Sequence, residues 1–240
     1  MVIDDVLAPI NGVVFDFHST LVDGGDPARW IRDALRRLDD AGVTVPGLSD
    51  ATFTSLREHL NHIWTHAHGI DPASERDLDP ARHRDVFARS VALLPGIDPA
   101  LTDALYAVMR DQWEAYDDTL PVLRELKSRG VKIVVLSNIG MDIRDCLDRA
   151  GVGDLLDGVV LSYEVGLTKP DPAIFQHVIK LLDLPGSQVL MVGDSPRDDV
   201  GGAALGIRTL ILPRTQGPVH GLSAVLRLVG DRPATSVVEG

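Results

Sequence analysis

Asp16 is the residue whose position most strongly suggests chemistry. It follows a short apolar run, Val13-Val14-Phe15, and precedes Phe17-His18-Ser19-Thr20. A β-branched and aromatic run that ends in an acid indicates a buried strand with a carboxylate at its carboxyl end. In open α/β sheets, ligands bind at that end of the strands. Asp16 is therefore a candidate metal ligand, a candidate nucleophile, or both.

Three other polar clusters are placed where they could join Asp16. Ser137-Asn138 follows the apolar run 133–136, Gly193-Asp194-Ser195 follows the run 189–192, and Lys169 lies just before Pro170. The carboxyl ends of parallel strands share one edge of a sheet. We therefore expect these side chains to form a site rather than part of a core.

The residue types in these clusters fit phosphate and a divalent ion. Asp16 and Asp194 would supply the few carboxylates that Mg²⁺ accepts beside water and substrate phosphate. Asp199 could orient the ligands or a metal-bound water. Lys169 would neutralise the charge of a phosphate or of Asp16. The hydroxyl of Ser137 and the free amides of the helix that follows would form an anion site.

The elements that must position these residues alternate between strand and helix. This alternation, with glycines at helix ends, predicts a parallel sheet with right-handed crossovers. The predicted strands are 13–17, 132–136, 158–161, 189–192 and 209–212, and the predicted helices are 120–129, 142–150, 172–182, 198–205 and 221–229. Residues from Asp231 onward are expected to form a loose tail.

A helical segment of about ninety residues interrupts this pattern after the first strand. Apolar residues recur there at helical spacing, and structureless loops of that length are uncommon in compact domains. The predicted fold class is therefore α/β: a doubly wound parallel-sheet (Rossmann-like) core domain, 1–22 and 117–240, with an inserted all-helical domain, 23–116.

Composition limits the classes of partner. The chain has 240 residues with a net charge of −12, which argues against a nucleic-acid surface, since that needs a basic face. An acidic protein can still bind a small phosphorylated substrate, because a bound metal ion reverses the local field. A single cysteine, Cys146, excludes an intramolecular disulfide. Residues 1–5 lack the features of a signal peptide, and the apolar runs are too short to span a bilayer. We expect a cytoplasmic protein without a membrane partner.

The polar clusters together resemble the motifs of the haloacid dehalogenase superfamily of hydrolases, chiefly its phosphatase branch. Four motifs occur in the family's order over the whole sheet domain. They are Asp16-Phe17-His18-Ser19-Thr20, Ser137-Asn138, Lys169-Pro170-Asp171-Pro172, and the segment 193–199 followed by Gly202-Ala203. Each motif alone is weak, whereas all four at matching elements are specific.

The resemblance implies a role for each catalytic residue. Asp16 would attack phosphorus and form an aspartyl phosphate, while Ser137 and Lys169 would hold the transferred phosphoryl group. Thr20 and Asn138 would contact the substrate. The reaction implied is hydrolysis of a small phosphorylated metabolite, and the insert would be the helical cap that selects the substrate by opening and closing. The expected assembly is a monomer or a homodimer.

The resemblance also implies a Mg²⁺ site. Its ligands would be Asp16, Asp194 and the backbone carbonyl of His18, and Asp199 would support them, more readily from outside the ligand set than as a direct ligand. These four residues are the predicted metal residues, and Mg²⁺ is the predicted cofactor.

His18 departs from the family pattern. Phosphatases of the family carry a second aspartate there, which protonates the leaving group and then assists water. Three interpretations follow. His18 performs the proton transfers, since imidazole is a competent acid and base at neutral pH; catalysis is weak or absent and the fold serves binding; or the protein is a dehalogenase. The dehalogenase branch generally has tyrosine at that position and lacks the acidic pair Asp194 and Asp199, so their presence favours metal and phosphate.

Two further groups in the insert carry alternatives. His59, His62 and His66 are spaced along one predicted helical face, but they span two turns, too far for one ion to bind all three. We expect them to form a surface of the cap. Arg29, Arg32, Arg36 and Arg37 either contact an anionic substrate or form a solvated helix face paired with neighbouring acids, and the second interpretation is favoured.

Overall fold

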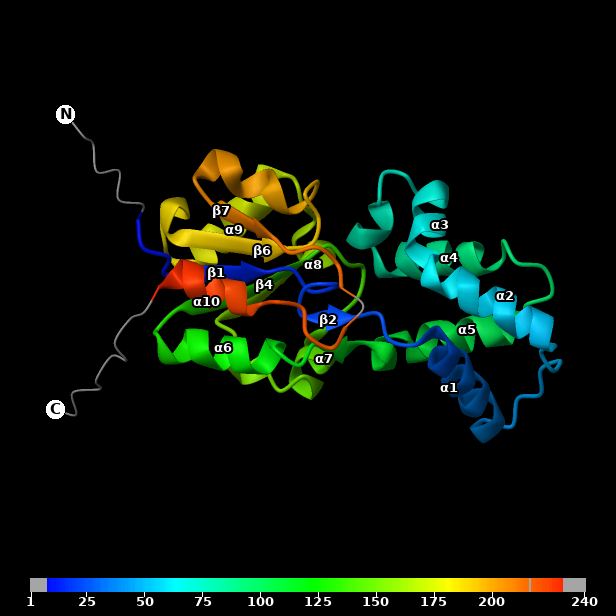
Figure 1. Ribbon diagram of the computed structural model, residues 1–240. Coiled ribbons are helices and arrows are strands. Elements are labelled where there is room, and N and C mark those ends of the chain that lie inside the picture. The colour runs from blue at the N-terminus through cyan, green and yellow to red at the C-terminus, as the bar shows by residue number, and fades with distance from the viewer. Residues whose placement is uncertain (1–7, 216, 231–240) are drawn as a thin grey trace, which may run out of the picture. The chain divides into compact units, whose positions relative to one another are not determined.

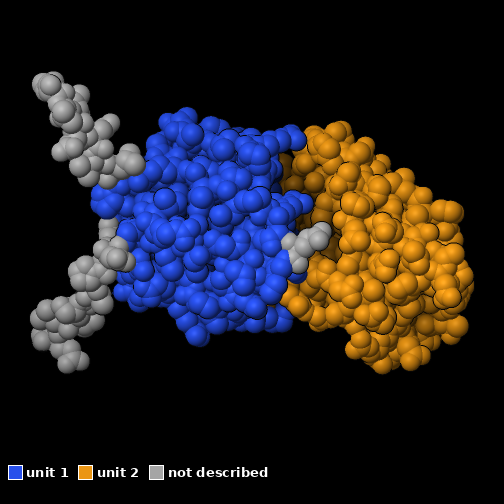
Figure 2. Space-filling model, viewed as in Figure 1, with its two compact units in different colours: residues 1–23, 115–138, 147–240 blue, residues 24–114, 139–146 orange. Residues whose placement is uncertain are grey.

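The chain folds into two compact units. The computed structural model describes residues 8–215 and 217–230, so the expectations for residues 1–5 and for the tail from Asp231 lie outside the described residues. One unit comprises residues 1–23, 115–138 and 147–240, and the other comprises residues 24–114 and 139–146 (Figure 2). We call them the sheet unit and the helical unit.

The sheet unit is built on five parallel strands in the order β5-β4-β1-β6-β7 (Figure 1). The chain moves outward from β1 to β4 and β5, then returns to the other side of β1 for β6 and β7. The order of the strands therefore reverses between β1 and β6. The strands are β1 (Gly12–Phe15), β4 (Lys132–Ser137), β5 (Gly158–Leu161), β6 (Val189–Gly193) and β7 (Arg208–Ile211).

Both faces of this sheet are covered, as expected for parallel strands with continuous apolar sequence. Val14, Val134 and Met191 point to one face, where they pack with Phe175 and Val178 of α9. Helices α6 and α10 pack together on the other face (Figure 1). The helical elements after residue 115 are α6 (Thr119–Ser128), α7 (Arg144–Arg149), η3 (Gly153–Leu155), α8 (Ser162–Val165), α9 (Pro172–Leu182), η4 (Gly186–Gln188), η5 (Asp199–Leu205) and α10 (Ser223–Val229). Of these, α7 is divided between the two units, because residues 144–146 belong to the helical unit.

The predicted fold class is confirmed, and most element bounds agree within two residues. The prediction for α9 matches because its signals are local: Asp171 caps the helix and Pro172 opens it. One element differs in type. The predicted helix 198–205 is the 3₁₀ helix η5. Its sequence contains Gly201-Gly202, which have poor α-helix propensity, and it packs closely against the segment that carries Lys169.

The helical unit contains five α-helices and no β-strand among residues 24–113, all of which the structure describes. The helices are α1 (Pro27–Asp40), α2 (Asp50–Asn61), α3 (Ile63–Ile70), α4 (Pro80–Val91) and α5 (Pro99–Val108), with 3₁₀ turns η1 (Glu75–Leu78) and η2 (Met109–Gln112). Two short strands, β2 (Val22–Asp23) and β3 (Glu114–Ala115), pair as a second sheet. None of the helices among the described residues is long and apolar enough to cross a membrane.

Residues 139–146 belong to the helical unit although they follow β4, and the sequence analysis did not expect this. Gly140 lies so close to η1 that a Cβ atom would approach the carbonyl oxygen of Arg76 to 2.2 Å. Arg110 donates a hydrogen bond of 3.0 Å to Asp142 O and forms an ion pair with Asp145. These contacts between segments distant in sequence tie the loop after β4 to the inserted helices.

Candidate active site

Asp16 lies at the carboxyl end of the central strand. β1 ends at Phe15, which is level with Val192 of β6. The backbone N–H of Asp16 continues this pairing with a hydrogen bond of 2.8 Å to Val192 O. Ser137 ends the neighbouring strand β4, and Asp194 follows the last residue of β6. The predicted residues thus share one edge of the sheet, at the place where the strand order reverses and where open α/β sheets bind ligands.

Lys169 bridges two buried carboxylates. Its Nζ atom lies 2.6 Å from Oδ1 of Asp16 and 2.7 Å from Oδ1 of Asp199. The exposed fractions of the three side chains are 3% for Lys169, 12% for Asp16 and 0% for Asp199. Charge-assisted hydrogen bonds of this length are among the stronger ones in proteins. Lys169 therefore holds the Asp16 carboxylate in one orientation.

Asn138 fixes the backbone of Lys169. Its Nδ2 donates to Lys169 O at 2.9 Å, and its Oδ1 accepts from the Lys169 N–H at 2.8 Å. Both ends of the Asn138 side-chain amide are thus engaged with the residue whose ammonium group contacts Asp16. The sequence predicted that Asn138 and Lys169 belong to one site, but it did not indicate that the Asn138 side chain binds the Lys169 backbone.

Asp199 is held at both carboxylate oxygens. While Oδ1 contacts Lys169, Oδ2 accepts a hydrogen bond of 3.0 Å from the backbone N–H of Ser195. Two glycines leave room for this arrangement. A Cβ at Gly193 would lie 2.0 Å from Asp199 Oδ2, and a Cβ at Gly201 would lie 2.1 Å from Pro170 O. Larger residues at either position would push Asp199 or η5 away from Lys169.

A tight turn follows Asp16 and carries His18. Phe17 O accepts the backbone N–H of Leu21 at 2.9 Å, and Ser19 adopts a left-handed φ of 58° that non-glycine residues seldom take. The half-buried ring of His18 packs edge-on against Phe17, with ring centroids 4.8 Å apart. The turn folds the chain back directly after the nucleophile candidate.

Thr20 and Ser137 supply buried hydroxyl groups at this edge. Thr20 Oγ1 donates a long hydrogen bond of 3.4 Å to Oδ2 of Asp16, the oxygen that Lys169 does not contact. Ser137 is 2% exposed. The structure thus places Thr20 on Asp16 itself, and it places Ser137 at the end of the adjacent strand.

Asp194 pairs with an arginine that the sequence analysis did not select. Arg214 Nε donates to Asp194 Oδ2 at 2.5 Å. The Asp194 side chain is 8% exposed and that of Arg214 is 77% exposed. A weaker signal for Arg214 was present, since it follows β7 after the two intervening residues Leu212 and Pro213. The predicted site contained no residue that follows the run 209–212.

Burial and charge shift the pKa values of the central pair. Burial raises the pKa of Asp16 to about 6; Lys169 opposes this rise, and Asp199 and Asp194 add to it. Burial lowers the pKa of Lys169, but Asp16 and Asp199 raise it by more, so it lies above its ordinary value. Lys169 is therefore protonated at neutral pH. In the absence of a metal ion, the Asp16 carboxyl group loses its proton around pH 6.

The donors at this edge suit a hard divalent ion. Asp16 and Asp194 follow the neighbouring strands β1 and β6, and the negative charge of Asp194 contributes to the raised pKa of Asp16. In the described part of the chain, no set of three or more His, Cys, Asp or Glu side chains is arranged to hold a metal ion. Mg²⁺ does not require such a set, because it commonly takes one or two carboxylates and completes its shell with water and phosphate oxygens. Asp16, Asp194 and the carbonyl of His18 fit that pattern.

The histidines of the helical unit do not share one helix. α2 ends at Asn61 and α3 begins at Ile63, so His62 lies at the break between them. The rings of His59 and His66 stack with their centroids 4.1 Å apart, and His59 Nε2 lies 2.7 Å from Ser90 O. Burial lowers the pKa of His59, which fits a neutral, hydrogen-bonded ring.

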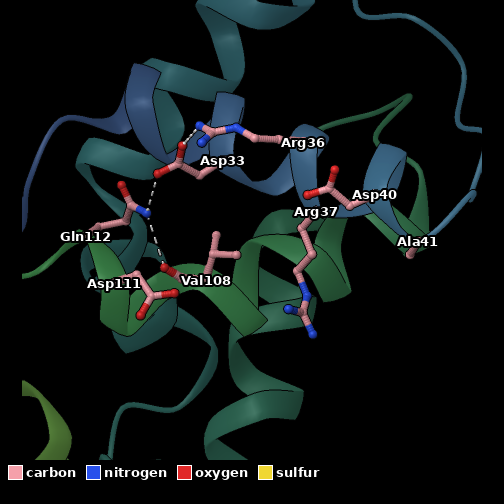
Figure 3. Close-up of a pocket in the computed structure, with 8 residues that line it drawn as sticks. All are labelled: Asp33, Arg36, Arg37, Asp40, Ala41, Val108, Asp111 and Gln112. Carbon is pink, nitrogen blue, oxygen red and sulfur yellow. Dashed lines mark hydrogen bonds and ion pairs between the residues drawn. The ribbon is translucent and has the colours of Figure 1, made fainter.

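A cavity of 570 Å³ lies in the helical unit, but none of the predicted site residues lines it (Figure 3). Its charged residues come from α1 and η2 and include both signs. Arg36 pairs with Asp33, which also accepts a hydrogen bond from Gln112. Arg29 pairs with Asp33 and Glu114, and Arg32 pairs with Asp26. These ion pairs agree with the interpretation of α1 as a solvated, paired helix face.

Comparison with known proteins identifies the family. The sequence profile described as haloacid dehalogenase-like hydrolase matches residues 10–206, which include all the predicted site residues. A glyceraldehyde 3-phosphate phosphatase from Methanopyrus kandleri is 27% identical over 200 residues, covering 81% of this chain and 79% of its own length. A phosphoserine phosphatase from Thermus thermophilus is 33% identical over 156 residues, covering 63% of this chain and 62% of its own.

The fold is shared with solved structures as well. The crystal structure of a 2-haloacid dehalogenase from Pseudomonas syringae pv. tomato aligns with a TM-score of 0.59 and 22% identity, covering 92% of this chain and 98% of that one. At this identity the likeness establishes the fold alone.

The match of the sequence profile to residues 10–206 shows that the chain belongs to the haloacid dehalogenase-like hydrolase family. The predicted family and the predicted class of enzyme, a hydrolase, are confirmed.

Proposed function

We propose that this protein is a Mg²⁺-dependent phosphatase of a small phosphorylated metabolite that works through an aspartyl phosphate on Asp16. The observation that carries the proposal is the buried pair of Asp16 and Lys169, whose atoms Oδ1 and Nζ lie 2.6 Å apart, beside the acidic residue Asp194. The two curated relatives described above are named for phosphatase activity on small phosphate monoesters, which supports the same class of substrate.

The reaction has two steps centred on Asp16. A carboxylate oxygen of Asp16 attacks phosphorus, and the bond from phosphorus to the leaving oxygen breaks. Water then attacks the phosphorus of the aspartyl phosphate, which frees the carboxylate and releases inorganic phosphate. Lys169 orients the nucleophile and neutralises phosphoryl charge, and the hydroxyl of Ser137 holds a phosphoryl oxygen.

The remaining residues act through this pair or through the metal ion. We infer that Asn138 positions Lys169 and that Thr20 holds Asp16. Asp16, Asp194 and the carbonyl of His18 would hold Mg²⁺, which supplies positive charge beside the phosphoryl oxygens when bound. Asp199 supports the site through Lys169 rather than as a direct ligand, because both of its oxygens already accept hydrogen bonds. The helical unit is the candidate cap that selects the substrate.

The first prediction concerns pH. Asp16 attacks only as a carboxylate, and its pKa of about 6 in the absence of metal is raised from 3.8. We expect kcat/KM to fall as pH drops, by about tenfold per pH unit below the midpoint. Because a bound cation favours the charged form, the midpoint should lie at or below about pH 6 and should move down as Mg²⁺ is increased. Steady-state measurements of kcat/KM against pH at several Mg²⁺ concentrations would locate this midpoint. A midpoint that does not change with Mg²⁺ concentration would contradict the assignment of the midpoint to Asp16.

The second prediction concerns His18, which we assign as the acid and base. His18→Asp would keep the backbone carbonyl but replace imidazole by a carboxyl group of lower pKa. We expect turnover to fall or the basic limb of the pH profile to shift toward lower pH. His18→Asn, which cannot transfer protons, is the matched control and should lose about 10²-fold or more in kcat. Higher turnover in His18→Asp would instead show that the histidine impairs catalysis.

Release of inorganic phosphate tests the whole proposal. The purified protein would be offered p-nitrophenyl phosphate and a panel of sugar and nucleotide phosphates, in Mg²⁺ and in EDTA. Mg²⁺-dependent release supports the phosphatase. No release from a folded protein that binds Mg²⁺ would favour a binding role on the same fold, as the loss of the second aspartate suggests. Metal-independent release of halide from a 2-haloacid would overturn the proposal in favour of a dehalogenase.

A further inference from the structure

Arg214 is a charged residue at this site that the proposed reaction does not use. Its Nε atom contacts Asp194 Oδ2 at 2.5 Å, yet 77% of its side chain is exposed. Among residues 8–215 and 217–230, Arg214 makes no other hydrogen bond or ion pair. The two terminal amino groups of its guanidinium are therefore available to a further partner.

The charges around Arg214 indicate that it would leave Asp194 when a divalent ion binds there. Three carboxylates, Asp16, Asp194 and Asp199, face two cations, and Lys169 lies between Asp16 and Asp199. Arg214 is thus the counter-ion of Asp194 in the metal-free protein. A divalent ion at Asp194 would compete for the same carboxylate and would repel the guanidinium. Binding of the ion would release Arg214 at the rim of the site.

The chain is anchored to the sheet unit just before Arg214, because the backbone N–H of Leu212 donates a hydrogen bond of 2.9 Å to Gly193 O. A second anchor lies further along, at residues 220–222. The carboxylate of Asp118 accepts the backbone N–H groups of His220, Gly221 and Leu222 at 2.9, 2.8 and 2.7 Å. The ring of His220 also stacks on Tyr116, with centroids 4.7 Å apart. The Arg214 side chain is long enough to exchange one anion for another by rotation about its own bonds.

We propose that Arg214 is a substrate-binding residue that exchanges Asp194 for a second anionic group of the substrate when a divalent ion is bound. Guanidinium binds carboxylate and phosphate in a two-point geometry that a phosphate ester bearing either group could use. The substrate class is therefore a phosphate monoester with a carboxylate or a second phosphate. This inference rests on the proposed phosphatase function and adds selectivity to it.

The first readout is metal affinity without substrate. Binding of Mn²⁺, used as the probe ion, would be followed by the electron paramagnetic resonance of free Mn²⁺. Arg214→Gln should tighten binding about threefold or more, because it removes the competing cation. Arg227→Gln, which removes an exposed arginine from α10 of the same unit, is the control for net charge and should leave the affinity unchanged.

The second readout separates the substrates. In Arg214→Gln, KM should rise about tenfold for a phosphate ester that carries a carboxylate, with O-phosphoserine as the probe, while KM for p-nitrophenyl phosphate stays within about twofold. Arg214→Lys should recover part of the loss because it restores the charge without the two-point geometry.

The outcomes separate this inference from the proposed function. If the unaltered protein neither binds Mn²⁺ nor releases phosphate, the proposed function fails and the inference fails with it. If the unaltered protein does both, the role of Arg214 is overturned by unchanged Mn²⁺ affinity in Arg214→Gln, by equal effects on the two substrates, or by the absence of any preference for the anionic ester in the unaltered protein.

Discussion

Asp16→Asn should abolish phosphate release, with a loss of about 10⁴-fold or more in kcat. An amide oxygen is a poor nucleophile, so the substitution removes the first chemical step. In the unaltered protein, Lys169 Nζ lies 2.6 Å from Asp16 Oδ1. The fold should persist in Asp16→Asn, because asparagine is nearly the same size as aspartate and its oxygen can still accept a hydrogen bond from Lys169. Phosphate release under single-turnover conditions, with circular dichroism as the check on folding, measures both parts.

The control for Asp16→Asn is Asp16→Glu, which keeps the charge but moves it by one methylene group. It should be almost as inactive, because the attacking oxygen would be displaced from the line of attack. If Asp16→Asn retained full activity, Asp16 would be excluded as the nucleophile.

Lys169→Met should impair both stability and activity. The substitution removes the ammonium group that lies 2.6 Å and 2.7 Å from two buried carboxylates, and leaves them without their cation. Removal of one partner from a buried ion pair costs about 3–5 kcal/mol in free energy of unfolding. We expect the free energy of unfolding to fall by about this amount at pH 8, and kcat to fall by about 10²-fold or more.

The sign of the pH dependence in Lys169→Met follows from the pKa of Asp16. That pKa is already raised above 3.8 by burial, and without Lys169 it should rise further. Because the folded state then binds a proton more tightly than the unfolded state, the cost of Lys169→Met is greatest above the folded pKa and is relieved as pH falls through it. Urea denaturation at pH 8 and pH 5, followed by circular dichroism, compares the two conditions.

Two variants serve as controls for Lys169→Met. Lys180→Met removes an exposed lysine from α9 and should be neutral. Lys169→Met combined with Asp199→Asn also removes one buried carboxylate, so its stability should exceed that of Lys169→Met alone. Equal stability of Lys169→Met and the unaltered protein at pH 8 would show that the buried ion pairs do not stabilise the fold.

The features that could be predicted from sequence depend on local patterns. Apolar runs locate β1, β4, β5, β6 and β7, and the polar residues after the runs of β1, β4 and β6 indicate the edge of the sheet where the site lies. The cap and first proline of α9 fix its start. These signals are carried within a few neighbouring residues, so one sequence is sufficient to read them.

The features that could not be predicted depend on residues far apart in the chain. The amide of Asn138 pairs with the backbone of Lys169, 31 residues away, and Arg214 pairs with Asp194, 20 residues away. The break at His62 lies inside a continuous helical pattern, and no side-chain capping bond at His62 marks it. Sequence spacing carries no direct information on such contacts.

The central claim is tested most directly by trapping the phosphoryl group on Asp16 during turnover. Sodium borohydride reduces an aspartyl phosphate to homoserine, which peptide mapping by mass spectrometry can locate. Reduction of Asp16 in the presence of Mg²⁺ and substrate, and none without substrate, is the result that we predict. Continued phosphate release with no reduction of Asp16, or a phosphoryl group found on another residue such as His18, would contradict the account.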